Sequence, residues 1–189
     1  MSLAYCRAAP GHPEHGPYHD REYGFPQRDE RVLFERLVLE INQAGLSWLT
    51  ILKKRAAFTA AYAEFDVDRV ADFGPADVAR LLGDAGIIRN RLKVAAAIDN
   101  ARRVQGLRAS HGSFADWLLA HHPLPKEEWV KLFGKTFRFT GGEIVGEFLM
   151  SLGYLPGAHA PSCPVYKTIL TLDPPWSWKP DKARKRAKK

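Results

Sequence analysis

Residues 81–88 of the 189-residue chain read Leu81-Leu82-Gly83-Asp84-Ala85-Gly86-Ile87-Ile88, and this stretch indicates the type of fold. It holds the apolar end of one helix, a Gly-x-x-Gly turn and the apolar start of a second helix, which is the form of a helix-hairpin-helix. Gly83 and Gly86 permit the backbone to lie close to a partner. Many helical hairpins contain two glycines without such a partner, so the turn alone is weak support for binding.

The residues that follow the turn add to the case for nucleic-acid binding. A helix is expected from about Ile88 to Val104, and its start offers unpaired amides and a positive dipole end to a phosphate. Arg89, Arg91 and Lys93 come at this start. The stretch therefore predicts sequence-independent contacts with a DNA backbone through Gly83, Gly86, Ile88, Arg89 and Arg91, although a solvated helix face would also be basic.

Helical periodicity extends on both sides of the hairpin, and alternation typical of strands is scarce, so an all-α protein is expected. Residues 1–28 hold four prolines and three glycines and are expected to be an ordered loop region or a poorly structured arm. The helix starts have clear capping residues. The expected helices run from Asp29 to Gly45, from Ser47 towards Phe65, from Asp66 to Gly74, from Pro75 through Leu82, around Trp117 and Leu118, and last from Thr140 to Gly153.

Composition indicates one helical domain over residues 1–178 and a disordered basic tail over 179–189. Seven basic residues and Asp181 give the tail +6 of the net charge of +7. The tail could attract nucleic acid or only aid solubility. No apolar run is long enough to span a membrane and no secretory signal precedes the domain. With two cysteines, this favours a reducing cytoplasm, no membrane partner and a monomer.

Glu40 falls on an apolar helix stripe with Leu33, Leu37 and Ile41. A buried carboxylate must be paired, protonated or directed at a pocket, because its uncompensated burial is costly. The alternative is a glutamate at the stripe's margin that reaches Arg36 or solvent. Glu40 is therefore a candidate for chemistry.

Trp48 begins the following helix, directly after the tight turn at residues 44–47. An aromatic face beside an anion is a good receptor for a flat, cationic ligand that donates hydrogen bonds. Trp48 could equally be a core aromatic residue. Together, Glu40 and Trp48 suggest a pocket for such a ligand.

Both cysteines of the chain lie near histidines. Cys6 precedes His19, and the second cysteine ends the stretch His159-Ala-Pro-Ser-Cys163. Four such ligands would satisfy tetrahedral zinc and would join the two ends of the domain. The alternatives are two unrelated thiols or one disulfide, and His12 and His15 compete with His19 as a ligand.

These motifs resemble those of the DNA-3-methyladenine glycosylase I family, and the match runs from about Cys6 to Cys163. The resemblance implies an all-α helix-hairpin-helix DNA glycosylase fold with a zinc site that joins the N- and C-terminal segments near residues 6–19 and 159–163. The block from Gln43 to Arg55 is the most specific part. The matching residues are Tyr18-His19-Asp20, Leu39-Glu40, Gln43-Ala44-Gly45-Leu46-Ser47-Trp48, Leu52-Lys53-Lys54-Arg55, Phe65-Asp66, Asp84-Ala85-Gly86-Ile87-Ile88-Arg89, Phe137-x-Phe139-x-Gly141 and His159-x-x-x-Cys163.

The resemblance also implies roles for individual residues. Glu40 would hydrogen-bond the extruded purine, Tyr18 and Trp48 would wall the base pocket, and Gln43 is retained with them. Gly45 and Leu46 would fill the gap that the flipped base leaves in the duplex. The implied ligands of a structural Zn²⁺ are Cys6, His19, His159 and Cys163.

The expected activity is monofunctional hydrolysis of the N-glycosidic bond of alkylated purines, chiefly 3-methyladenine, in double-stranded DNA. The catalytic aspartate of helix-hairpin-helix glycosylases is missing, because its place falls at Gly106, and Asp99 and Asp116 are out of position. A 3-alkylated adenine nucleotide is already cationic, so the lesion itself supplies the activation of the leaving group. The alternative is a DNA-binding protein that recognises lesions or structures with weak or no glycosylase activity.

Several positions depart from the family pattern and leave the preferred lesion open. Ala8 and Tyr23 stand where tryptophans are usual, and Ile41 and Asn42 replace smaller or more polar residues. Tyr23 is still expected at the base pocket. Glu147 would either add a second carboxylate to that pocket, raising its preference for cationic or amino-rich bases, or face water as a surface residue.

Overall fold

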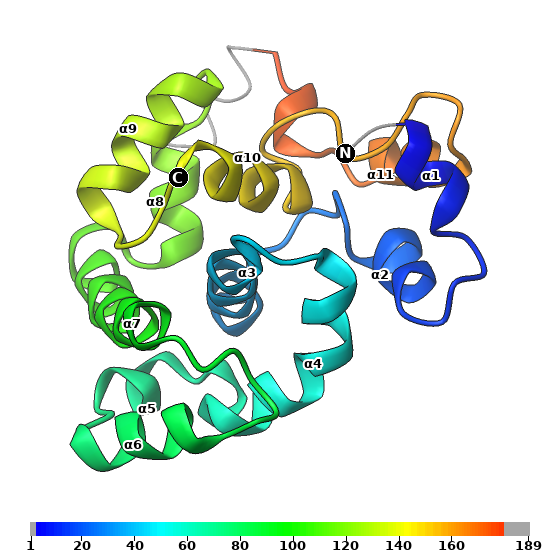
Figure 1. Cartoon of the computed structure of the whole chain (residues 1–189). Helices are drawn as coiled ribbons and strands as arrows, with labels where there is room; N and C mark the ends of the chain where they lie inside the picture. Colours follow the sequence, from blue (N-terminus) through cyan, green and yellow to red (C-terminus); the bar gives the residue numbers. More distant parts are fainter. Residues whose placement is uncertain (1–2, 180–189) are drawn as a thin grey trace.

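The computed structural model describes residues 3–179, and every regular element in that part of the chain is a helix (Figure 1). The expected all-α class is therefore confirmed. The elements are α1 (Leu3–Ala8), α2 (His15–Arg21), α3 (Glu30–Gln43), α4 (Trp48–Ala61), the 3₁₀ turn η1 (Ala63–Phe65), α5 (Val67–Ala71), α6 (Pro75–Gly83), α7 (Arg91–His111), α8 (Phe114–His121), α9 (Lys126–Thr136), α10 (Gly142–Ser151), α11 (Pro164–Thr171) and the 3₁₀ turn η2 (Pro175–Ser177).

Helix α3 lies at the centre of the molecule and packs against α4, α7, α8 and α10 (Figure 1). Ten of its fourteen residues are buried, which explains why its sequence is apolar on more than one side. Asp29 begins it as expected, because its side chain accepts the backbone N–H groups of Arg31 and Val32. Ser47 caps α4 and Asp66 caps α5 in the same way. These three predicted starts are confirmed.

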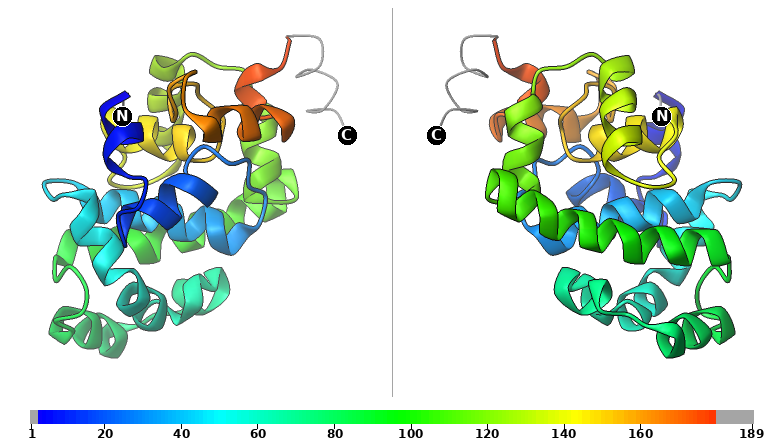
Figure 2. Two further views of the ribbon diagram at one scale, coloured as in Figure 1. Left: turned by 90° about the vertical axis from the view of Figure 1, so that its right-hand side faces the viewer. Right: turned by 90° about the vertical axis from the view of Figure 1, so that its left-hand side faces the viewer.

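The hairpin between α6 and α7 is longer than the sequence suggests. Helix α7 begins at Arg91, not near Ile88, because the side chain of Asn90 caps it by accepting the backbone N–H groups of Leu92 and Lys93. It also continues past Val104 to His111. Figure 2 shows α7 crossing the molecule, with α5 and α6 on one side of it and α8 on the other.

Within this hairpin, Gly86 is required by close packing. A Cβ atom there would lie 2.9 Å from the Cβ of Ala57 on α4. The Nζ atom of Lys54 donates hydrogen bonds to the carbonyl oxygens of Ala85 and Gly86, at 2.8 and 3.2 Å. Helix α4 therefore holds the hairpin in place. Gly83 is exposed and a Cβ atom there would meet nothing, so the fold itself does not require glycine at that position.

Four helices were not predicted. Helices α1 and α2 lie in the segment that was expected to be a loop region or a poorly structured arm, and α9 and α11 were also missed. Each of these helices is short or interrupted by prolines and glycines, and each is held by contacts with distant parts of the chain. The helix expected from Thr140 to Gly153 is α10, which begins at Gly142, ends at Ser151 and is followed by α11.

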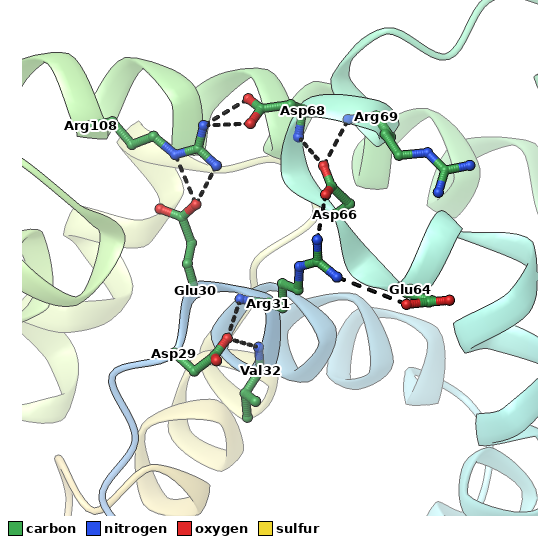
Figure 3. A network of polar contacts seen from close by, with 9 residues as sticks. All are labelled: Asp29, Glu30, Arg31, Val32, Glu64, Asp66, Asp68, Arg69 and Arg108. Carbon is green, nitrogen blue, oxygen red and sulfur yellow. Dashed lines mark hydrogen bonds and ion pairs between the residues drawn. The ribbon is translucent and has the colours of Figure 1, made fainter.

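Half-buried and exposed ion pairs join α3, α5 and the end of α7 (Figure 3). Arg108 on α7 donates to Glu30 at the start of α3, at 2.8 Å, and to Asp68 on α5, at 2.7 Å. Arg31 reaches Asp66 at 2.7 Å. The 3₁₀ turn η1 packs against α3, α4 and α5, and its residues have positive φ angles between 52° and 58°. Such left-handed backbone is unfavourable for residues with a Cβ atom, so packing around it must hold it.

The two ends of the domain lie side by side, since α1 and α2 are next to α11 (Figure 1). Residues 180–189 lie outside the described part of the chain, and the predicted basic tail falls almost entirely on them. No helix among residues 3–179 is long and apolar enough to cross a membrane.

Candidate functional site

Glu40 is buried in the last turns of α3, with 2% of its surface exposed. No described residue donates a hydrogen bond to its carboxylate. Its pKa is raised to about 8, chiefly by burial and also by the nearby charge of Glu147, while the charge of Arg36 opposes the rise. The prediction that Glu40 points inward from the apolar stripe is confirmed, and the alternative of a solvent-facing side chain is wrong.

Three buried aromatic residues, Tyr18, Tyr23 and Trp48, form an aromatic wall beside Glu40. The ring centroid of Tyr18 lies 5.1 Å from that of Trp48 and 5.6 Å from that of Tyr23. The charge of Glu40 helps to raise the pKa of both tyrosines, which places both near its carboxylate. The indole N–H of Trp48 is buried and has no hydrogen-bond partner among the described residues.

Arg36 orients one end of this wall. Its Nη1 atom donates to the hydroxyl of Tyr18 at 2.9 Å, and its guanidinium lies 4.8 Å from the centre of the Tyr18 ring. Its Nη2 atom donates to Glu22 at 3.1 Å. Arg55 on α4 binds the other oxygen of Glu22 at 2.7 Å and pairs with Glu35 through two hydrogen bonds. A partly buried ionic network thus holds Tyr18 and includes Arg36, whose charge acts on Glu40.

In the sequence, Arg36 is expected only as a possible surface partner of Glu40. The structure instead places it in the interior, with 1% of its surface exposed. Its position four residues before Glu40 on α3 was visible in the sequence. Its partners on two other segments were not, because they depend on how those segments fold around α3.

Glu147 on α10 belongs to the same site. Its Oε2 atom accepts a hydrogen bond of 3.0 Å from the hydroxyl of Tyr23, and the side chain is half-buried. The expectation that Glu147 faces water as a surface residue is therefore wrong. The reason is that Tyr23 is fully buried and its hydroxyl is directed at α10, where it meets this carboxylate.

A groove of about 740 Å³ runs along this site and is open to solvent. Its walls are the turn between α3 and α4 and the first turns of α10. Glu147 belongs both to the groove and to the surroundings of Glu40. The groove therefore reaches Glu147, whose charge acts on the buried carboxylate, while Glu40 and the three aromatic rings do not themselves line it. Its lining residues are Gln43, Ala44, Gly45, Leu46, Ser47, Gly141, Gly142, Glu143, Ile144 and Glu147.

The turn at the rim of the groove has two features suited to contact with a partner. Gly45 has a φ of 82°, a left-handed conformation that glycine adopts without strain. Leu46 follows it with 40% of its surface exposed, which is unusual for a large apolar side chain in this molecule. Both predicted residues lie together at the surface, and Gln43 lies beside them.

Lys93 links this turn to the hairpin. Its Nζ atom donates to the carbonyl oxygens of Asn42, at 2.9 Å, and Ala44, at 2.7 Å. The sequence grouped Lys93 with the exposed basic residues after the hairpin, but its side chain is buried. Its function at the end of α3 could not be predicted, since the sequence does not show which carbonyl groups it reaches.

The other hairpin residues lie away from the groove. Arg89 and Arg91 are exposed, Ile88 and Gly86 are half-buried, and none of them lines the groove. The predicted site residues thus form two groups on the molecule, which Lys93 connects through the end of α3.

Cys6, His19, His159 and Cys163 form a third group, here termed the Cys/His cluster. Their ligand atoms lie within 4.8 Å of one another. The Sγ atom of Cys163 is 3.7 Å from His19 Nε2 and from His159 Nδ1, and Cys6 Sγ is 3.8 Å from His159 Nδ1. Sulfur and nitrogen ligands of one tetrahedral zinc ion are separated by about 3.6 Å. The four side chains therefore fit such an ion.

In each histidine, the ring nitrogen that faces away from the other ligand atoms also has a hydrogen-bond partner, as is usual for metal ligands. His19 Nδ1 lies 2.7 Å from Asp20, and His159 Nε2 lies 2.7 Å from the backbone oxygen of Tyr23. The cluster is thereby connected to the aromatic wall. Each cysteine is a free thiol in this structure, which does not form the alternative disulfide.

Two predictions about competing residues can also be compared with the structure. His12 accepts the backbone N–H groups of Glu14 and His15, and the His15 ring lies 3.2 Å from the Tyr5 hydroxyl, so neither histidine belongs to the Cys/His cluster.

Asp99 pairs with Arg102 and Arg138, and Asp116 pairs with Arg28. Both aspartates are engaged away from Glu40, in agreement with the sequence.

Comparison with known proteins identifies the family. The family model for methyladenine glycosylase matches residues 8–131. The chain belongs to the methyladenine glycosylase family. A curated relative, the DNA-3-methyladenine glycosylase of Haemophilus influenzae, is 32% identical over 166 residues, which cover 78% of this chain and 89% of the relative.

Other relatives agree with this family. DNA-3-methyladenine glycosylase 1 of Escherichia coli is 46% identical over 107 residues, which span 56% of this chain and 57% of that protein. A crystal structure of 3-methyladenine DNA glycosylase I is 35% identical, with a TM-score of 0.75 over 84% of this chain and 97% of that one. The Staphylococcus aureus enzyme, studied for its recognition of 3-methyladenine, is 29% identical, with a TM-score of 0.76 over 87% of this chain and 97% of that one.

Proposed function

We propose that this chain is a DNA glycosylase that hydrolyses the N-glycosidic bond of alkylated purines, chiefly 3-methyladenine. The observation that carries the proposal is the Glu40 carboxylate, which is buried beside three aromatic rings and accepts no hydrogen bond from the described residues. A group of this kind is costly unless a ligand completes it. A flat base that is cationic and donates N–H bonds would do so, and the solvent-open groove reaches Glu147, whose charge acts on Glu40.

The mechanism requires little from the protein beyond binding. The nucleotide of 3-methyladenine is cationic and breaks down to a neutral base, so the lesion activates its own leaving group. Glu40 would accept the N–H of the base, and Tyr18 and Trp48 would stack against it as the bond lengthens. The buried Lys93 is bound to two carbonyl oxygens, so it does not serve as a nucleophile. Hydrolysis by water alone is expected.

Duplex DNA would contact two surfaces. Leu46 and Gly45 would enter the gap that the flipped base leaves, while Gly83, Gly86, Ile88, Arg89 and Arg91 would hold a phosphate as a helix-hairpin-helix. The exposure of Leu46 and of both arginines supports this arrangement. Lys93 fixes the relative position of the two surfaces.

The Cys/His cluster would hold a structural Zn²⁺. Its atom separations and the hydrogen bonds to the outer nitrogens of both histidines support zinc. Bound zinc would supply a fixed link between the ends of the domain. The chain itself would then hold Tyr18, next to His19, and Tyr23, which is bound by His159, in the aromatic wall.

Base release from methylated duplex DNA, with the free purines separated by chromatography, tests the proposed activity. Wild-type protein should release 3-methyladenine, and Glu40→Gln should reduce release by about a hundredfold or more while DNA binding persists. Glu128→Gln, an exposed substitution of the same kind on α9, should leave release unchanged. A protein that binds the duplex but frees no purine would instead be a non-catalytic lesion-binding protein.

A further inference from the structure

The loop between α9 and α10 carries Phe139 in an unusual setting. Its φ is 61°, a left-handed conformation that is unfavourable for a residue with a Cβ atom, and 40% of its surface is exposed. Phe65 has a similar φ of 56°, but its ring is buried in the core. Burial therefore offsets the unfavourable backbone much less at Phe139 than at Phe65. Strain that is retained at an exposed side chain points to a functional role.

Helix α7 holds the backbone of this loop just before the exposed ring. The buried side chain of Asn100 accepts the backbone N–H of Arg138 at 2.7 Å and donates to its carbonyl oxygen at 3.1 Å. The guanidinium of Arg138 pairs with Asp99. Arg103 donates to the carbonyl oxygen of Thr136 at 2.7 Å. The loop is therefore fixed by contacts with α7, and the ring is kept at the surface.

The same loop leads into one wall of the groove. Gly141, two residues after Phe139, lines the groove with the first turns of α10. The exposed Leu46 belongs to the other wall. Figure 2 shows the turn between α3 and α4, the hairpin after α6 and the loop before α10 on the same side of the molecule. An exposed apolar side chain thus accompanies each wall of the groove, on the side that carries the hairpin.

Positive charge predominates around this loop. Lys135 in the last turn of α9 is exposed, as are Arg103 and Arg138. The acidic group beside them is Asp99, which pairs with Arg138. Such a surface favours DNA phosphates, and an aromatic ring among them offers a face on which a base can stack.

We propose that Phe139 is a DNA-contact residue, which packs against a nucleotide beside the extruded one while Leu46 fills the gap in the stack. This inference rests on the proposed function and adds a second apolar contact with the same duplex. Because Asn100 fixes the loop in the free protein, the ring is already in place when DNA arrives, and little ordering is required on binding.

Binding of a duplex that contains the tetrahydrofuran analogue of an abasic site tests this contact in the full-length protein. Phe139→Ala should weaken that binding about tenfold and leave the affinity for free 3-methyladenine unchanged. Phe139→Tyr keeps an aromatic ring and should restore the affinity for the duplex to within about twofold. Leu170→Ala is the control, because Leu170 on α11 has a similar exposure of 42% and should not contribute.

The fluorescence of 2-aminopurine shows where the ring lies. Placed next to the abasic analogue, this base should change its fluorescence when wild-type protein or Phe139→Tyr binds, because the ring alters its stacking. The change should be smaller with Phe139→Ala. Equal changes with all three proteins would overturn the proposed position.

Phe139→Gly separates the ring from the strained backbone. Glycine adopts the left-handed conformation without strain, so this variant should melt at a higher temperature than Phe139→Ala but bind the abasic duplex equally weakly. Affinity that recovers together with stability would overturn the inference, because the backbone and not the ring would then matter. If Phe139→Ala does not fold, the glycine substitution provides the binding test.

The remaining outcomes distinguish this contact from the proposed function. Wild-type affinity for the abasic duplex in folded Phe139→Ala would overturn the contact alone, provided that wild-type protein releases 3-methyladenine from DNA. Equal losses of duplex and free-base binding would also overturn it, since the loop would then act on the base site. If wild-type protein neither prefers the abasic duplex to an intact one nor releases 3-methyladenine, the proposed function fails and the contact fails with it.

Discussion

The Nζ atom of Lys93 lies 2.7 Å from the carbonyl oxygen of Ala44, so the first turn of α7 is tied to the turn that carries Gly45 and Leu46. A carbonyl at the end of a helix needs such a partner, because the helix itself provides none. The same side chain also satisfies Asn42, so one ammonium group completes the end of α3.

Lys93→Met should therefore disturb the turn at the groove while leaving the aromatic wall in place. We expect a loss of about 1–3 kcal/mol in the free energy of unfolding from the unsatisfied carbonyls. Excision from duplex DNA should fall at least tenfold. The affinity for the 3,9-dimethyladeninium ion, a cationic base with a methyl group in place of the sugar, should change little. Lys131→Met, an exposed lysine on α9, is the control. Equal losses in both assays would contradict a role confined to the turn.

The activity should depend on pH through Glu40. Its pKa of about 8 in the free protein means that the carboxylate is mostly protonated at pH 7. A cationic lesion binds the ionised form, so kcat/KM should rise from pH 6.5 and level off above pH 8.5 or so. In Glu147→Gln the loss of the neighbouring charge lowers the Glu40 pKa, and the rise should move to lower pH. A kcat/KM value that is flat across this range would contradict the assignment.

Glu40 should also make the folded state less stable at high pH. The carboxyl group titrates near 4.5 ordinarily and at about 8 in the folded protein. Between these values the unfolded chain releases a proton that the folded chain retains, so stability falls as pH rises from about 4.5 to 8. Glu40→Gln lacks this titration. Urea unfolding should show equal stability near pH 4.5 and an advantage for the variant, on the order of a few kcal/mol, at pH 9.

Loss of the proposed zinc should weaken the link between the N-terminal and C-terminal segments of the domain. Cys163→Ser should lose stoichiometric zinc and lower the melting temperature by about 5–10 °C, since the cluster joins α1 and α2 to the segment before α11. His12→Ala changes a neighbouring histidine outside the cluster and should retain zinc. Wild-type protein that is well folded and contains far less than one zinc per chain would count against the site.

The predictable parts of the fold were those set by local chemistry. Asp29, Ser47 and Asp66 begin helices because their own side chains bind the next backbone amides, and sequence reveals this directly. The burial of Glu40 followed from the helical period of its apolar neighbours. Both kinds of signal lie within a few residues of the feature that they predict.

The missed parts depend on contacts between distant segments. Helix α2 contains Gly16 and Pro17, and the short helix α1 is separated from it by further prolines and a glycine, all of which favour loops. Contacts with distant segments, such as those of Cys6 and His19 with His159 and Cys163, accompany their helical form. The left-handed turn at η1 has no local signal, since alanine and phenylalanine rarely adopt it. Arg36 and Lys93 were read as surface charges because their partners lie on other elements.

The Cys/His cluster also has a consequence for how the protein is made. Synthesis proceeds from the N-terminus, so Cys6 and His19 leave the ribosome long before His159 and Cys163 exist. Helices α1 and α2 can reach their final positions only after the last part of the domain has been synthesised. Tyr18 and Tyr23 would therefore take their places in the aromatic wall only after residue 163 has been synthesised, and a chain that ends before Cys163 lacks at least one residue of the Cys/His cluster.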